Sequence, residues 1–208
     1  MARFWVEMNW LGPLLGLIAA LALSGCAVEG MPAAAPQRPD AVKLTTEKDG
    51  RFLVLTGPQL RHAEPFVGIA STNFYLLRSF IDTRNGETVH QLYVQESYPG
   101  AERNWNAARL AYGGMLRFVA INKQEITCDY GCSYAEEFGA SLPDALLRAN
   151  SQGFTVAFTA RSGLEKMVVV PGDLIAKQLA AVAGARANPA TAATAPTPTA
   201  ASAPAPPR

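Results

Sequence analysis

Two closely spaced cysteines have the most sharply defined chemistry in this chain. Cys128 and Cys132 flank three residues, and Gly131 stands where a three-residue hairpin loop favours a left-handed backbone. The two thiols would then meet across a strand ladder, so we predict a structural disulfide that stabilises the fold by about 2 kcal/mol at most. A redox-active pair is the alternative, but the spacing exceeds Cys-x-x-Cys by one residue and no helix N-terminus follows to lower a thiol pKa.

The third cysteine, Cys26, closes an apolar run that begins near Leu11 and is too short to span a membrane as a helix. Leu23-Ser24-Gly25 precedes it, so two small residues stand before a nucleophilic thiol. This segment resembles the lipobox of bacterial lipoprotein precursors. The resemblance implies cleavage before Cys26, lipids on its thiol, and a mature domain held at a membrane that faces an oxidising compartment.

The residues around the lipobox leave the start of the chain and its final membrane open. Ala27 and Val28 follow the cysteine, where an Asp often marks inner-membrane retention in lipoproteins of diderm bacteria. The outer membrane, on its periplasmic side, is therefore the expected destination, with the inner membrane as the alternative. The positive charge before the apolar run rests on Arg3, which Glu7 offsets, and Met8 is a second possible start. The other interpretation is an N-terminal stretch that is cut at an ordinary signal-peptidase site or retained as an anchor, with Cys26 not lipidated.

Aromatic and guanidinium side chains gather in a stretch that resembles a loop around Gly113 and Gly114. Such side chains bind sugars or peptides by stacking and by forked hydrogen bonds. The candidate binding surface consists of Tyr98, Arg103, Trp105, Arg109 and Tyr112. The alternative is that Trp105 and Tyr112 close one end of the core.

No constellation of residues predicts catalysis or metal binding. Glu136 and Glu137 are adjacent, so on a strand they point to opposite faces, and both are expected to be solvated. His62 and His90 stand alone, and the chain has no Gly-x-Ser-x-Gly motif to supply a serine nucleophile. A second cysteine pair that would complete a metal site is also missing from the sequence. We therefore assign no catalytic residue, no metal ligand and no cofactor.

Charge and composition divide the chain into four segments. Eighteen Lys and Arg residues against 17 Asp and Glu give a formal net charge of +1, which does not indicate a nucleic-acid partner. Residues 1–25 are the predicted signal peptide, and residues 26–41 are a Pro- and Ala-rich flexible tether. Residues 42–183 have the size of one domain with a single core. Residues 184–208, rich in Ala, Thr and Pro, are a predicted disordered tail.

Turn signals at residues 48–50, 85–86 and 161–163 separate apolar runs and predict hairpins. Residues 116–128 and 132–140 are expected to form another hairpin across the two cysteines. Six or seven antiparallel strands and two short helices are typical of an α+β domain that is mainly antiparallel β, with a sandwich-like or curved sheet.

Both predicted helices have recognisable starts. Ser141 is expected to cap the first, with Pro143 in its first turn and Asp144 suited to its N-terminus. Asp173 is expected to cap the second, which Gly184 would end.

Residues 74–182 also loosely resemble short envelope lipoproteins of unknown function, a likeness that carries over no functional residue. We expect a lipid-anchored, non-catalytic binding or assembly component at the outer membrane, with an envelope protein or the cell wall as partner. One alternative is an envelope hydrolase whose carboxylates only the fold brings together. The other is a redox module that uses Cys128 and Cys132.

Overall fold

The computed structural model describes residues 40–129 and 131–187. The predicted signal peptide, Cys26, the tether as far as residue 39 and the tail beyond residue 187 lie outside the described residues. The strands are β1 (Lys43–Thr46), β2 (Phe52–Thr56), β3 (Leu60–Arg61), β4 (Phe74–Asp82), β5 (Thr88–Pro99), β6 (Trp105–Leu110), β7 (Gly113–Thr127), β8 (Ser133–Leu142), β9 (Gly153–Ala160) and β10 (Glu165–Pro171). The helices are α1 (Asp144–Ala149) and α2 (Gly172–Ala187), and a 3-10 turn, η1, covers Phe66–Gly68.

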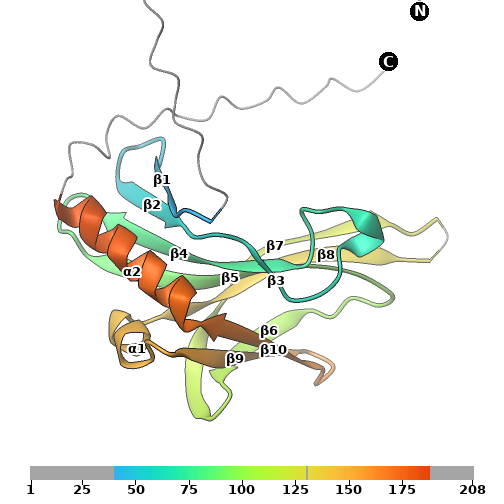
Figure 1. Ribbon diagram of the computed structural model, residues 1–208. Helices are drawn as coiled ribbons and strands as arrows, with labels where there is room; N and C mark the ends of the chain where they lie inside the picture. Colours follow the sequence, from blue (N-terminus) through green and yellow to red (C-terminus); the bar gives the residue numbers. More distant parts are fainter. Residues whose placement is uncertain (1–39, 130, 188–208) are drawn as a thin grey trace, which may run out of the picture. The chain divides into compact units, whose positions relative to one another are not determined.

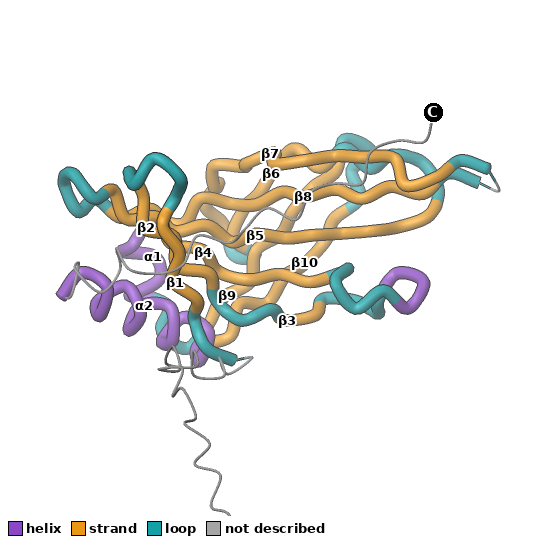
Figure 2. Tube along the Cα trace, turned by 90° about the horizontal axis from the view of Figure 1, so that it is seen from above, coloured by secondary structure: helices purple, strands orange, loops and turns teal. Residues whose placement is uncertain are grey.

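The strands form one antiparallel sheet that curls into a half-barrel (Figure 1). Its order is β1-β2-β4-β5-β8-β7-β6-β9-β10, and β3 pairs with β4. Strand β7 joins the two halves of the sheet, because its first residues pair with β6 and the rest pair with β8. Figure 2 shows β7 and β8 running side by side to the tip of their hairpin. The predicted α+β class, mainly antiparallel β, is confirmed, and the sheet is curved rather than sandwich-like; in the described residues it has ten strands where six or seven were expected, because short strands such as β3 and β6 carry little sequence signal.

Alternation along the central strands gives the sheet an apolar inner face. Leu92 and Val94 on β5 are fully buried and lie on this face, because residues two positions apart on a strand point the same way. Phe138 of β8 and Phe158 of β9 belong to the same core cluster, and their rings meet edge to face with centroids 5.0 Å apart. Burial of each such side chain stabilises the fold by about 1.5–3 kcal/mol. The inner face therefore holds the two halves of the sheet together.

Helix α2 covers this apolar face and contacts strands on both sides of the half-barrel, namely β2, β4, β9 and β10 (Figure 1). Leu174, Ile175 and Val182 are its main buried apolar residues. Gln178 is also fully buried, and its Nε2 donates to the Leu55 carbonyl at 3.0 Å. The helix thus closes the half-barrel from one side.

The ends of both helices differ from the prediction. Ser141 does not cap α1, because it still pairs with Gln91 on β5, and the helix begins only after Pro143. Helix α2 begins at Gly172, so Asp173 lies in its first turn rather than at the cap. It also continues past Gly184 to Ala187, and Ala185 remains buried against the sheet.

The stretch between Pro99 and Gly113 is not the expected loop. Residues 105–110 form strand β6, which pairs with β9 as well as with β7. The signal was weak because β6 contains two alanines, an asparagine and an arginine, and its strand character comes from its two neighbours. The predicted disulfide between Cys128 and Cys132 is present at the tip of the β7–β8 hairpin. Neither described helix has the length and apolar character needed to cross a membrane.

Candidate functional site

The hairpin of β6 and β7 splays apart and leaves a cleft between its strands. The two strands pair only near their turn, over residues 108–110 and 113–116. Beyond that point β6 follows β9, whereas β7 follows β8. The gap holds a cavity of about 380 Å³, within the range of small-ligand sites. It is lined by Asn104, Trp105, Asn106, Phe118, Ala120, Ile121, Asn122, Lys123, Glu136, Glu137, Phe138 and Arg161.

Aromatic rings form the apolar part of the cleft. Phe138 stacks on Trp105 with ring centroids 5.2 Å apart and on Phe118 at 6.1 Å. Trp105 is only 5% exposed, and its indole Nε1 has no hydrogen-bond partner among the described residues. A buried donor without a partner is rare in proteins and calls for an explanation, because it loses its hydration on folding.

Charged and amide side chains stand at the mouth of the cleft. Lys123 bridges it, with its Nζ 2.7 Å from Glu102 and 2.9 Å from the Asn104 side-chain oxygen. The hydrogen bond from Lys123 lowers the pKa of Glu102. Asn104, which lines the cleft, has a positive φ of 55°, a left-handed conformation that Asn adopts more readily than most residues. Arg161 has no ion-pair partner in the described part of the chain.

Behind the rings, two glutamates from neighbouring strands face each other across the register. Glu96 on β5 lies opposite Glu136 on β8, and both are about 5% exposed or less. Glu136 was expected to be solvated, and that expectation is wrong. It accepts hydrogen bonds from the Tyr98 hydroxyl and from the backbone N–H groups of Asn104 and Trp105, at 3.0 and 3.2 Å for the two amides. Burial, together with Glu136, raises the pKa of Tyr98.

Glu96 is held by two cations. Its Oε1 lies 2.7 Å from Arg103 and 2.8 Å from Lys166, while its buried Oε2 has no partner among the described residues. The Lys166 Nζ also lies 3.3 Å from Nδ1 of His62, whose Nε2 lies 2.9 Å from the Gln95 carbonyl. A neutral His62 satisfies both contacts, with Nε2–H as donor and Nδ1 as acceptor. Burial lowers the pKa of His62 and favours this neutral form.

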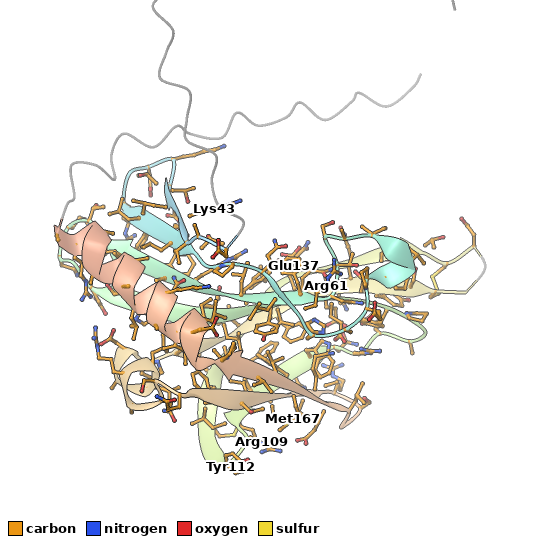
Figure 3. All side chains as sticks on the ribbon, in the orientation of Figure 1. Lys43, Arg61, Arg109, Tyr112, Glu137 and Met167 are labelled. Carbon is orange, nitrogen blue, oxygen red and sulfur yellow. A yellow bond between two sulfur atoms is a disulfide. The ribbon has the colours of Figure 1, made fainter. Side chains whose placement is uncertain are left out.

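The structure brings together three of the five residues of the predicted binding surface. The Arg103 guanidinium lies over the ring of Tyr98, 4.0 Å from its centroid, and the Arg103 backbone N–H donates to the Tyr98 hydroxyl. Trp105, two residues after Arg103, lines the cleft. Arg109 and Tyr112 lie elsewhere. Arg109 pairs with Glu165 at 2.9 Å, and Tyr112 is fully exposed at the turn of the hairpin. Figure 3 shows both at the end of the hairpin away from Glu137, which lines the cleft.

A second polar chain links Ser79, His90 and Asp144, so the expectation that His90 stands alone is wrong. Ser79 Oγ lies 2.7 Å from His90 Nδ1, and His90 Nε2 lies 3.1 Å from Asp144 Oδ1. Gln178 Nε2 lies 2.8 Å from the same hydroxyl, under α2. Ser79 and His90 have no exposed surface, so no substrate reaches the hydroxyl in this arrangement. The chain of hydrogen bonds joins β4, β5 and both helices rather than forming a catalytic triad.

A larger cavity, of about 540 Å³, lies between the β1–β2 hairpin, the β4–β5 turn and the end of α2. Its apolar lining includes Leu53 and Ile81 from a small core cluster. Its charged groups are already engaged. Asp82 is held by Arg84 at 2.7 Å, and Arg186 donates to the Thr88 hydroxyl at 2.6 Å. The cleft beside Trp105 is the stronger candidate because its lining includes Arg161, an exposed cation without an ion-pair partner in the described part of the chain.

The cleft was only partly visible in the sequence. Glu96 follows Leu92 and Val94 at inward positions of β5, so its alternation alone marks it as a buried charge. The ion pair between Glu96 and Lys166 could not be predicted from the sequence, because the two residues lie far apart in the chain and only the fold brings them together. Within residues 40–129 and 131–187, no group of three His, Cys, Asp or Glu is placed to hold a metal ion. No protein-family model, curated protein or solved structure matches this chain.

Proposed function

We propose that this chain is a lipid-anchored envelope protein that binds a partner in the cleft between β6 and β7, without catalysing a reaction on it. The observation that carries this proposal is an open cavity lined by the rings of Trp105, Phe118 and Phe138, with charged and amide side chains at its mouth. A preformed apolar pocket with a few convergent polar groups is the usual form of a binding site.

The carboxylates near the cleft favour binding over hydrolysis. Glu136 accepts three hydrogen bonds, and Glu96 is paired with two cations, so the structure holds both side chains in fixed positions through contacts within the protein. A general acid or base needs a carboxyl group within reach of the substrate and free to exchange a proton. The pairing of the two glutamates across neighbouring strands keeps a hydrolase as the second candidate. That candidate predicts turnover that is lost in Glu136→Gln.

The anchor is proposed from the lipobox resemblance alone. Cys26 would carry the lipids, the outer membrane would be the site of residence, and the domain would face the periplasm, with the inner membrane as the alternative. Mass spectrometry of the mature N-terminus tests this: we expect a peptide that begins at an acylated Cys26. An unmodified N-terminus upstream or downstream of Cys26 would refute the anchor.

Photo-crosslinking in intact cells tests the cleft. A photoreactive residue in place of Asn106, which lines the cleft, should form a defined adduct, whereas the same residue in place of Lys48, on the β1–β2 turn, should not. Ala120→Phe adds a ring to the cleft wall and should abolish the adduct. Gln124→Phe, on the same strand but outside the cavity lining, is the matched control and should retain it. Equal adducts from both crosslinking positions would refute a cleft-specific partner.

A further inference from the structure

We propose that the occupant of the cleft is an extended polypeptide segment with an acidic side chain, which pairs through its backbone with the free edge of β7. This inference rests on the proposed role of the cleft as the binding site and names the class of ligand. Three features of the cleft favour a partner polypeptide: the free strand edge in its wall, its ring-lined floor and the charge at its rim.

Both long walls of the cleft are strand edges without a pairing partner among the described residues. From residue 117 to residue 127, β7 pairs with β8 on one side only. Residues 105–107 of β6 likewise pair with no described strand other than β9, although the Trp105 N–H donates to the Glu136 side chain. An unpaired edge presents a row of N–H and C=O groups, which is the template that an added strand uses. The cavity is lined by five consecutive or near-consecutive β7 residues, 118 and 120–123, so the free edge itself forms the wall.

A β-bulge interrupts the regular pairing of β7 with β8 along this edge. The register between β7 and β8 shifts between Ala120 and Asn122, which leaves Ile121 as the extra residue. Ile121 is 39% exposed and lines the cleft. Bulges are common at sheet edges and beside binding sites, where they redirect side chains. A small rigid ligand would not require an extended edge of this kind.

The side chains of the cleft match alternate residues of an extended segment. An apolar side chain fits over the rings of Trp105, Phe118 and Phe138. Next to them, Arg161 is an exposed cation at the rim without an ion-pair partner in the described chain, whereas Lys123 is paired with Glu102. The acids of the lining are less available, since Glu136 already accepts three hydrogen bonds and Glu137, the next residue on β8, directs its side chain to the opposite face of the sheet. The unpaired charge is thus positive and fits an acidic residue.

The composition of the C-terminal tail of this chain makes it a poor ligand for the cleft. Residues 188–208 contain no Asp or Glu and have prolines at 189, 196, 198, 204, 206 and 207. Proline lacks the N–H group that strand pairing uses, so it is confined to special positions on strands. The tether, residues 26–39, has one acid, Glu29, and prolines at 32, 36 and 39, so it is also poorly suited to strand pairing, and a separate polypeptide is the inferred occupant.

A displayed library of linear dodecapeptides, selected against the purified full-length protein in detergent, supplies the probe. The selected peptide should contain an acidic residue, bind with a measurable Kd, and protect alternate amides of residues 117–124 from hydrogen exchange. Arg161→Gln should weaken binding about tenfold, which corresponds to 1.4 kcal/mol. Arg109→Gln, outside the cleft, should leave the Kd unchanged.

Two proline variants test the backbone pairing. Asn122 and Lys123 follow each other on β7 beyond the bulge, so one N–H faces β8 and the other faces the cleft. Of Asn122→Pro and Lys123→Pro, one should be destabilised and the other should keep its stability and lose at least tenfold in affinity. Asn122→Ala and Lys123→Ala are the matched controls and should bind as the parent does, apart from any effect of the lost lysine charge.

The outcomes separate this inference from the proposed function. If Ala120→Phe abolishes binding but the stable proline variant binds like its alanine control, the cleft function stands and strand pairing is wrong. If the library yields no binder, or exchange protection falls outside residues 117–124, the inference is also wrong. If Ala120→Phe leaves peptide binding unchanged, the cleft is not the site and both proposals fail.

Discussion

Glu96 brings a negative charge into the half-barrel and holds Arg103 and Lys166 there. The three groups come from β5, from the segment before β6 and from β10, so their ion pairs tie together parts of the sheet that share no backbone hydrogen bonds. Buried ion pairs add little net stability compared with apolar residues, but removal of one partner leaves uncompensated charge. The cluster therefore acts mainly to fix the spacing of the two halves beside the cleft.

Glu96→Gln should lower the free energy of unfolding by about 3 kcal/mol, because two partly buried cations lose their counter-charge. Glu165→Gln is the matched control. It breaks the exposed pair with Arg109 and should change stability by less than about 1 kcal/mol. Urea denaturation of both variants measures the difference, and equal losses would contradict the account of the buried cluster.

Both histidines should make the fold sensitive to mild acid. Burial lowers the pKa of His62 and of His90 below the unfolded value of 6.5. Below pH 6.5 the unfolded chain therefore takes up protons that the native state does not, and stability falls as the pH falls. The loss is at most about 1.4 kcal/mol per pH unit for each histidine.

Urea denaturation at pH 7.5, 6.5 and 5.5 checks this pH dependence. The wild-type free energy of unfolding should be nearly flat between the first two values and lower at the third. His62→Gln, which retains a donor for the Gln95 carbonyl, should show a smaller decrease. A wild-type stability that rises between pH 6.5 and 5.5 would show that the histidines are charged in the native state.

At the residue scale, the sequence identified Trp105, Arg103 and Tyr98 as neighbours in a candidate site because they are close along the chain. Glu96, Glu136 and Lys166 were not predicted as a cluster. Their meeting depends on strand order, which places β5 beside β8 and curls β10 across the inner face. The Ser79–His90 contact was hidden for the same reason, since it joins residues opposite each other on β4 and β5.

Strand β7 is the element on which the cleft depends, because it changes partners along its length. Its hairpin with β8 extends past the core and is closed by the Cys128–Cys132 disulfide. A disulfide that closes so short a loop restricts the unfolded chain little, with about 2 kcal/mol as an upper bound. It fixes the register at the tip of the hairpin rather than holding the domain together.

The double variant Cys128→Ser and Cys132→Ser should therefore remain folded, with a free energy of unfolding lower by no more than about 2 kcal/mol. In the parent, neither sulfur should react with a thiol reagent under native conditions. Rapid native reaction of either cysteine would support the redox module instead.

Helix α2 should contribute to stability through its buried side. Leu174→Ala removes a side chain that is 1% exposed and should reduce stability by about 2–5 kcal/mol. Lys177→Ala, on the solvent side of the same helix, should change it by less than about 0.5 kcal/mol. Comparable losses in both variants, measured by thermal and urea unfolding, would contradict the packing of α2 as the cover of the half-barrel.

At the element scale, apolar alternation and turn residues predicted the hairpins, the two helices and the disulfide turn. Strand β6 was missed because its residues have weak strand preference, and pairing with β7 and β9 determines its conformation. Ser141 has the side chain of a helix cap, but the ladder between β5 and β8 extends through it and delays the helix. For both β6 and Ser141, pairing with neighbouring strands overrode the local preference of the sequence.

For the whole molecule, the inner face of the sheet has two parts with different roles. Leu92, Val94 and Phe158 form the apolar part beneath α2, whereas Glu96, Glu136 and Lys166 form the charged part beside the cleft. The first stabilises the fold. The second lies beside the opening between β6 and β7 and ties β5, β10 and the segment before β6 together there.

The emission of Trp105 tests the central claim, that this opening is a binding site, most directly. The chain has three tryptophans, and the proposed cleavage before Cys26 removes Trp5 and Trp10, so Trp105 is the single tryptophan of the mature protein and reports on the cleft. Addition of the selected dodecapeptide, in a version without tryptophan, should cause a saturable shift in its emission, and Ala120→Phe should abolish that shift. No shift, or an equal shift in the Ala120→Phe variant, would contradict the claim.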